Sequence, residues 1–324
     1  MKKIILALIL TGLFTTVNAQ RQYVFFLKNN EREVKEKDSA DFIRIVQEPD
    51  SGDVNFKLLE YYPSGTRKTI GYTSTVVPVT YEGPYASYYR NGKKKDIIRY
   101  NAGMLDGLGY HYFNNGTLRS QIDYSTGATK FRTELNFFTK EKVIYMADSA
   151  GNIMVKDGNG HFVDRTYQKN GDVITTEGDY KDGLKSGEWK LKCSANDYWY
   201  KEQFEEGRMI IGESYCDGKT YNYTQLEIPA KFKGGSKDFD RYLKRMLKYP
   251  SDAKSNRIKG IVFLSFVIEK DGCISDVKVD RSLYPSIDME ALRLLKNSPK
   301  WEPATGHGVP VQTIMRLFPI SFNF

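Results

Sequence analysis

The clearest hydrophobic pattern in the chain lies within its last ninety or so residues. Residues Ile261 to Ile268 are almost wholly apolar and rich in β-branched and aromatic types, which predicts a strand buried on both faces. Asp271-Gly272 follows, a pair that suits a tight hairpin turn because both residues tolerate positive φ. In the return run, Val277 and Val279 point to one face while charged residues point to the other. The pattern therefore predicts a β-hairpin.

Helical periodicity flanks this hairpin on both sides. From a predicted N-cap at Ser236, apolar residues recur at the spacing of one helical face as far as Tyr249-Pro250, where the proline ends the helix. A second helix is predicted from about Ser286 to Ser298, and a final strand from Val309 to Phe322. The order α-β-β-α-β predicts a small sheet with both helices on one face.

Short motifs in this part of the chain resemble those of a known family. In order, they are Lys233-Gly234-Gly235, Tyr249-Pro250-Ser251-Asp252-Ala253, Arg257-Ile258-Lys259-Gly260, Asp271-Gly272, Asp276-Val277 and Trp301-Glu302-Pro303. Each motif alone is common, but together, in this order and spacing, they resemble the C-terminal domain of TonB, the periplasmic part of the energy transducers that serve outer-membrane receptors. The resemblance covers about residues 230–324.

The resemblance implies a non-enzymatic protein that binds outer-membrane TonB-dependent receptors, and it raises energy-transducing transport as a further role. In that family the domain adds a short receptor peptide, the TonB box, as a strand at a sheet edge, where backbone hydrogen bonds supply the affinity. The last strand offers this edge. The corresponding residues here, with side chains expected to alternate between two faces, are Val311, Gln312, Thr313, Ile314, Met315, Arg316, Leu317 and Phe318. Pro319 suits an edge strand, because proline lacks the N–H that a central strand donates.

The first nineteen residues are typical of a signal peptide. A short positive segment precedes an apolar run from Ile4 to Val17, and small residues end at Ala19, so Gln20 is the expected mature N-terminus. The run is shorter than the about 20 apolar residues that span a bilayer. We therefore expect a periplasmic protein, and inner-membrane anchoring if the segment is not cleaved.

Between about Val54 and Leu226 the sequence repeats itself. Aromatic pairs precede a glycine turn, and Gly92 and Gly116 in two such turns lie 24 positions apart. A second set of motifs repeats with the same period, since Gly183 and Gly207 are also 24 positions apart, and each motif is followed by a further glycine such as Gly212. We assign all of these glycines to turns. A fixed period of this size indicates a stacked array, here of β-hairpins whose aromatic residues fill a shared core. The pattern resembles MORN-type repeats of exported bacterial proteins, although residues 125–165 fit it poorly.

Together these patterns predict a mainly β N-terminal repeat array of stacked β-hairpins, followed by a small α+β TonB-like domain. The predicted divisions are a signal peptide (1–19), a small β-rich module (20–74), MORN-type repeats (75–228) and the TonB-like domain (229–324). The 23 tyrosines recur at the repeat period, which favours a role in the core over a sugar- or lipid-binding strip.

Composition and charge narrow the function further. Lysine and arginine number 48 against 40 acidic residues, a formal charge of +8 with the two signs interleaved, so nucleic acid is not an expected partner. Cysteines and histidines lack metal-ligand spacing. No nucleophile elbow or phosphate loop is present, so we expect no catalysis, no cofactor and no small-molecule substrate. Cys193 and Cys216 are near one repeat period apart, which leaves a disulfide and two unpaired thiols both open, whereas Cys273 lies in a turn without an obvious partner.

Two features differ from a complete energy transducer. Residues 1–19 contain neither a histidine nor a full membrane span for contact with a proton-driven motor, and residues 20–228 contain only four prolines in place of a proline-rich reach across the periplasm. The sequence therefore predicts docking more firmly than energy transduction. The alternative is a structural or scaffold protein of the cell envelope whose repeats bind other envelope proteins.

Overall fold

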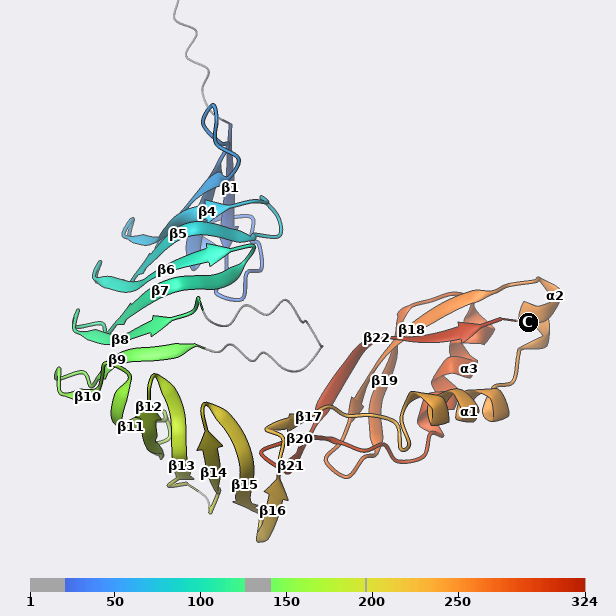
Figure 1. Cartoon of the computed structure of the whole chain (residues 1–324). Coiled ribbons are helices and arrows are strands. Elements are labelled where there is room, and N and C mark those ends of the chain that lie inside the picture. The colour runs from blue at the N-terminus through green and yellow to red at the C-terminus, as the bar shows by residue number, and fades with distance from the viewer. Residues whose placement is uncertain (1–20, 126–140, 196, 324) are drawn as a thin grey trace, which may run out of the picture. The chain divides into compact units, whose positions relative to one another are not determined.

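The computed structural model describes residues 21–125, 141–195 and 197–323 of the chain (Figure 1). The predicted signal peptide lies outside the described residues. The chain forms two compact units, residues 1–125 and residues 126–324. No helix among the described residues is long and apolar enough to cross a membrane.

The first unit is a series of antiparallel strands in which each strand pairs with the next one along the chain. Its elements are β1 (Gln22–Leu27), a 3-10 helix (Lys37–Ser39), β2 (Phe42–Gln47), β3 (Phe56–Tyr61), β4 (Arg67–Thr73), β5 (Tyr81–Tyr88), β6 (Lys94–Asn101), β7 (Met104–Tyr112) and β8 (Leu118–Asp123). The repeated β-hairpins that the sequence predicts are therefore present in this unit.

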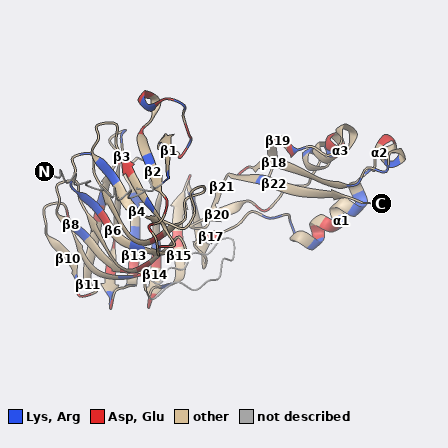
Figure 2. Ribbon diagram, turned by 90° about the horizontal axis from the view of Figure 1, so that it is seen from above, with Lys and Arg blue, Asp and Glu red and all other residues tan. Residues whose placement is uncertain are grey.

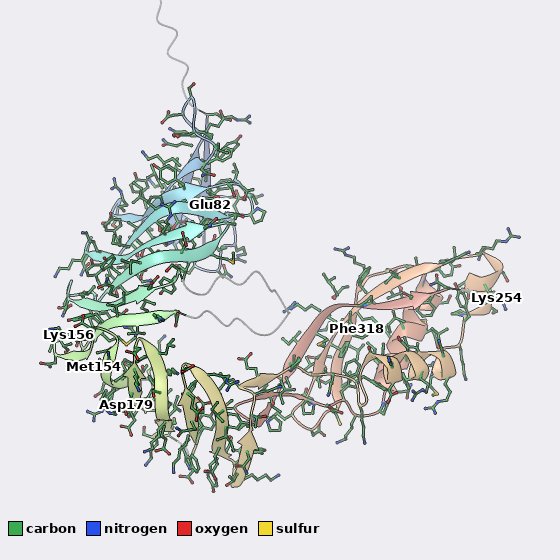
Figure 3. All side chains as sticks on the ribbon, in the orientation of Figure 1. Glu82, Met154, Lys156, Asp179, Lys254 and Phe318 are labelled. Carbon is green, nitrogen blue, oxygen red and sulfur yellow. The ribbon has the colours of Figure 1, made fainter. Side chains whose placement is uncertain are left out.

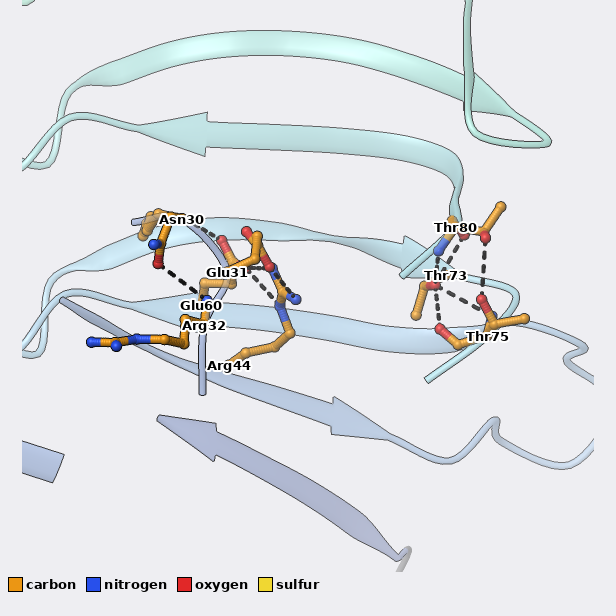
Figure 4. A network of polar contacts seen from close by, with 9 residues as sticks. Asn30, Glu31, Arg32, Arg44, Glu60, Thr73, Thr75 and Thr80 are labelled. Atoms are coloured by element: carbon orange, nitrogen blue, oxygen red, sulfur yellow. Dashed lines mark hydrogen bonds and ion pairs between the residues drawn. The ribbon is translucent and has the colours of Figure 1, made fainter. Parts of the chain in front are cut away.

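Alternate residues of these strands point into the core of the unit. In β2, Phe42, Arg44 and Val46 are buried. The guanidinium of Arg44 lies 2.6 Å from the buried carboxylate of Glu60 (Figure 4), and Lys68 lies 2.5 Å from the second oxygen of that carboxylate. Opposite charges therefore surround Glu60, as a buried carboxylate requires.

Tyrosines connect successive hairpins of the first unit. The turns that join β3 to β4, β5 to β6 and β7 to β8 each begin at an aromatic residue, and the glycine N–H donates back to its carbonyl, as Gly92 does to Tyr89 at 2.9 Å. The phenol of Tyr62 donates to the carbonyl of Tyr88 (3.0 Å), and that of Tyr89 donates to the carbonyl of Tyr112 (2.7 Å). The recurring tyrosines thus hold one repeat against the next.

The second unit begins with a further antiparallel series. Its strands are β9 (Lys142–Ala147), β10 (Ile153–Lys156), β11 (Asn159–Tyr167), β12 (Val173–Lys181), β13 (Leu184–Cys193), β14 (Trp199–Glu205), β15 (Arg208–Cys216) and β16 (Lys219–Tyr223). Lys/Arg and Asp/Glu are interspersed along the strands, as Figure 2 shows. Residues 142–165 include β9, β10 and part of β11, with a register shift between β9 and β10, although their sequence fits the repeat poorly. Cys193 and Cys216 are both free thiols, because β14 separates the two strands that carry them.

Some glycines of the array serve packing rather than turns. Gly178 and Gly212 lie within β12 and β15, and a Cβ atom on either would come within 2.3 Å of the aromatic ring of Trp189 or Tyr223, respectively. The assignment of Gly212 to a turn is therefore wrong. Each ring occupies the space that a side chain at the glycine would need.

Helices and two small sheets form the rest of the second unit. The elements are β17 (Glu227–Ile228), α1 (Ser236–Met246), α2 (Ser251–Ser255), β18 (Gly260–Ile268), β19 (Ile274–Arg281), α3 (Pro285–Lys296), β20 (Ala304–Gly306), β21 (Val309–Val311) and β22 (Thr313–Phe322). One sheet has the order β19–β18–β22 and the other β17–β20–β21. The predicted hairpin is confirmed as β18 and β19, whereas the predicted last strand is divided into β21 and β22 at Gln312. The N-cap of α1 is Gly235 rather than Ser236, and α2 was not predicted.

The core of this part lies on one face of the β19–β18–β22 sheet. Alternate residues of β18 from Val262 to Ile268 are fully buried, while Ile261 is 44% exposed. The prediction that β18 is buried on both faces is therefore wrong. Residues of α1 and α3 join this core, and the phenol of Tyr242 in α1 donates to the carbonyl of Leu294 in α3 at 2.8 Å. Both helices thus lie on the same face, as predicted.

Candidate functional site

Strand β22 forms one edge of the C-terminal sheet. Within the described residues it pairs only with β18, in a register that runs from Gly260–Phe322 to Ile268–Thr313. The other long side of β22 has no backbone partner in this part of the chain. A strand edge of this kind can accept another strand, because its outward N–H and C=O groups are available for hydrogen bonding.

Ile314 presents its backbone to the open side. Pro319 lacks an N–H and lies opposite Phe263, which is expected only where the pair is not hydrogen-bonded. Hydrogen-bonded and non-hydrogen-bonded pairs alternate along an antiparallel ladder. Val267 lies four residues after Phe263 on β18, whose burial alternates without interruption, and it pairs with Ile314. We infer that this pair is also non-hydrogen-bonded, so the N–H of Ile314 points away from β18.

A β-bulge interrupts β22 at Arg316 and Leu317. There β22 advances by three residues while β18 advances by two, and Leu317 has a φ of 51°. The N–H of Leu317 donates to Oδ2 of Asp280 in β19 at 3.1 Å, and the hydroxyl of Ser265 in β18 donates to Oδ1 at 2.9 Å. The Asp280 carboxylate therefore reaches across β18 and satisfies the amide that the bulge frees.

The bulge changes which side chains face outward. The sequence predicts Leu317 on the same face as Met315, and Phe318 on the same face as Ile314. In the structure, Phe318 (Figure 3) packs into the core with its ring centroid 5.3 Å from that of Phe239, while Leu317 is 49% and Ile314 56% exposed. The simple alternation is therefore wrong beyond Met315, because the extra residue reverses the faces.

The predicted docking residues occupy two strands rather than one. Thr313 to Phe318 lie on β22, but Val311 is the last residue of β21, in the other sheet. Gln312 lies between the strands, and its amide nitrogen donates to Oε2 of Glu269 at 2.8 Å. The open edge of β22 thus begins at Thr313.

A comparison with protein families agrees with the motifs from Tyr249 onward, while Lys233-Gly234-Gly235 precedes the matched residues. Residues 245–324 match the family model for the Gram-negative bacterial TonB protein C-terminal. The match extends from the end of α1 through β22, so it includes the edge strand and its neighbours. No curated protein matches the chain.

Several motif residues of this TonB-like domain meet at the β18–β19 turn. Gly272 has a φ of 84°, and its carbonyl accepts the N–H of Trp301 at 2.9 Å. A Cβ atom on Gly272 would lie 2.1 Å from the Trp301 carbonyl oxygen. The hydrogen bond from Lys300 to Asp271 (2.7 Å) lowers the pKa of that carboxyl well below its usual value. Asp271-Gly272 and Trp301 are therefore conformational requirements of the fold at this turn.

Other motif residues fix the loops around the same core. A Cβ on Gly260 would lie 2.9 Å from the side chain of Leu283, and a Cβ on Gly234 would collide with Asp238 at the start of α1. The phenol of Tyr249, which precedes Pro250, donates to the carbonyl of Ile258. Gly235 caps α1, and Pro303 directly precedes β20. These motif residues thus shape the loops around the core from which the edge strand β22 extends.

Asp280 is the residue at this site that the sequence does not reveal. It is one of two acidic residues on β19, and the bulge on a strand nearly forty residues later gives it a special role. Among the described residues, no three His, Cys, Asp or Glu side chains are grouped so that they could hold a metal ion. The edge itself offers backbone groups, the exposed apolar side chains of Ile314 and Leu317 and the exposed Arg316.

Proposed function

We propose that the protein is a periplasmic TonB-like protein that docks onto outer-membrane TonB-dependent receptors by pairing a receptor segment with β22. The family match to residues 245–324 supports the class of protein. The observation that carries the docking mode is the open side of β22, where Ile314 directs its N–H outward. Backbone hydrogen bonds would provide affinity and alternate side chains selectivity.

The bulge sets how much of the edge a partner can use. The N–H of Leu317 is already bonded to Asp280, and Pro319 has none. The uninterrupted part of the edge therefore extends from Thr313 to Arg316. Beside it, Ile314 and Leu317 offer exposed apolar surface and Arg316 an exposed charge. This edge suits a short extended segment better than a long strand.

The decisive variant is Ile314→Pro in the full chain, with Ile314→Ala as its matched control. Proline removes the outward N–H and leaves the pairing with β18 in place, whereas alanine keeps the N–H and removes only the side chain. A backbone hydrogen bond contributes about 1 kcal/mol net, so its loss alone weakens binding about fivefold, and distortion of the strand adds to this.

The assay is calorimetric titration with a synthetic TonB-box peptide, and circular dichroism confirms that each variant is folded. We expect Ile314→Pro to bind at least about fivefold more weakly than Ile314→Ala. Equal affinities in folded variants would refute docking at this edge. If the wild-type chain does not bind receptor peptides, the proposed function itself fails.

Export is part of the same proposal. The mature protein should begin at Gln20 and fractionate with the periplasm, because the first nineteen residues have the charge, length and small terminal residues of a cleaved signal. N-terminal sequencing of the purified protein tests this directly. An intact Met1 in washed inner membranes would instead support an anchored protein and an energy-transducing role.

The strand array is a second candidate for a binding surface. Met104 and Leu108 on β7 are 42% and 47% exposed, a small apolar surface on a strand whose other residues are half-buried or buried. A scaffold role would rest on such positions rather than on β22. Deletion of residues 54–226 separates the two roles, since receptor docking should survive the deletion and capture of an envelope protein by the repeats should not.

A further inference from the structure

The tip of the β20–β21 hairpin contacts the last strands of the array in the second unit. The turn consists of His307 and Gly308, with φ values of 49° and 77°. Two-residue turns with both φ values positive also join strands within the array, as at Asp182-Gly183. The hairpin of the TonB-like domain therefore ends in the same kind of turn that the array itself repeats.

The His307 side chain pairs with a buried acid of the array. Its Nδ1 lies 2.7 Å from Oε1 of Glu202 in β14, a residue 105 positions earlier whose side chain is 3% exposed. The phenol of Tyr223 in β16 donates to the same oxygen at 2.8 Å. The imidazole stacks on the ring of Tyr200, with centroids 4.3 Å apart and planes within 6°. The histidine is therefore held by a carboxylate, a phenol and an aromatic face.

Backbone contacts reinforce this position. The hydroxyl of Ser214 in β15 donates to the carbonyl of His307 at 2.6 Å, and the His307 N–H donates to the carbonyl of Leu226 at 2.7 Å. A Cβ on Gly308 would lie 2.9 Å from the ring of Tyr223. Residues from β14, β15 and β16 thus all contact the two residues of the turn.

The buried carboxylate of Glu202 gives an energetic reason for the contact between the hairpin tip and the array. A buried carboxylate is costly unless hydrogen-bond donors surround it, and the side-chain donors that the structure places on it are Tyr223 and His307. Lys185 supplies a nearby positive charge. The last repeat of a stacked array also needs a cover for its end, because no further repeat packs on it. The hairpin tip provides both the donor and the cover.

We propose that the β20–β21 hairpin, residues 304–311, is the cap of the strand array, and that His307 holds it in place through Glu202. We call these residues the hairpin cap. Because only Gln312 separates β21 from β22, the cap also connects the edge strand of the TonB-like domain directly to the array. The inference does not depend on receptor docking, but where docking occurs, a pull on β22 would pass into the array through the cap.

Hydrogen exchange on the full-length protein tests the cap, with His307→Ala as the main variant. In it, we expect the amides of residues 219–228 and 304–311 to exchange at least tenfold faster, while β1–β8 and β18 stay protected. The matched control is His161→Ala. Its imidazole also lies 2.7 Å from a carboxylate, that of Asp179, but both side chains are more than half exposed and belong to the array. This control should leave both segments unchanged.

A second variant separates the His307–Glu202 contact from general loss of structure. Glu202→Gln keeps the size of the side chain but removes its charge, so it should loosen the same two segments to a smaller extent. Combining it with His307→Ala should give no more exchange than His307→Ala alone, because both changes remove one interaction. Unchanged exchange in His307→Ala, or effects that multiply in the double variant, would overturn the proposal.

Discussion

Two turns of the array have nearly the same backbone conformation but different surroundings, so the same substitution should destabilise the protein by different amounts. Asp182-Gly183 and Asp217-Gly218 have φ values of 52° and 82°, and of 51° and 77°. Their surroundings differ. A Cβ on Gly183 would lie 2.9 Å from the carbonyl oxygen of Val143, whereas a Cβ on Gly218 would meet nothing within 4 Å. Gly218→Val therefore introduces backbone strain alone, whereas Gly183→Val introduces backbone strain and a steric collision.

The magnitudes follow from these contacts. A residue other than glycine at such a φ costs about 1–2 kcal/mol, and a β-branched one costs more, in both variants alike. Only Gly183→Val adds overpacking, worth about 1–3 kcal/mol. Relief by backbone movement would break the hydrogen bond from the Val143 N–H to the Gly183 carbonyl (2.9 Å), which contributes about 1 kcal/mol net. Gly183→Val should therefore be about 1–3 kcal/mol less stable than Gly218→Val.

Urea denaturation of the full chain measures this difference. Tryptophan fluorescence follows Trp189 and Trp199 of the array together with Trp301 of the TonB-like domain, and far-UV circular dichroism follows the strands. Both variants should unfold at lower urea than the wild type, and Gly183→Val at the lowest. Equal midpoints for Gly183→Val and Gly218→Val would refute the collision. If both variants unfold at the same urea concentration as the wild type, the assignment of Gly183 and Gly218 to turns with positive φ is refuted.

Two further predictions rest on other contacts. Gly272→Ala should destabilise the TonB-like domain by more than 1 kcal/mol in chemical denaturation, because its Cβ would collide with the Trp301 carbonyl at a positive φ; an unchanged midpoint would contradict this. Burial disfavours ionisation of Glu60, but Lys68 and Arg44 outweigh it and hold the pKa of Glu60 below its ordinary 4.5. The ionised Glu60 therefore stabilises the fold above pH 4.5, and this stabilisation is lost as the pH falls through the folded-state pKa. Glu60→Gln should lower the melting temperature at pH 7 and make it depend less on pH in the acid range. If the melting temperatures of variant and wild type fall in parallel with pH, the lowered pKa of Glu60 is refuted.

Features set by neighbouring residues could be predicted from the sequence. The β18–β19 hairpin follows from an apolar run, an Asp-Gly pair and an alternating return run, all within about twenty residues. The array follows in the same way from its period. Hydrophobicity does not show how many faces of a strand are covered, however. Ile261 and Phe263 are as apolar as their buried neighbours, yet they lie on the face of the sheet opposite the core that α1 and α3 join.

Features that join distant residues could not be predicted. The bulge at Leu317 depends on Asp280 of another strand, and the extra residue that it adds cannot be counted from an alternating pattern alone. Glu202 and His307 are 105 positions apart and share no motif. In the sequence, Gly178 cannot be told from a glycine in a turn. Its packing role is evident only from the ring of Trp189 on the next strand.

The bulge also helps to explain how a strand with an open edge can avoid aggregation in solution. A long unpaired strand pairs readily with a second copy of itself, and charges or bulges on edge strands prevent this. In β22, the exposed Arg316 and the bulge at Leu317 limit the uninterrupted edge to four residues, and Pro319 withholds the next donor. Four residues provide few hydrogen bonds for a continuous intermolecular sheet, and under the proposed function they would still suffice to pair with a short extended segment. The same irregularity that the sequence pattern could not reveal therefore keeps the open edge of β22 short.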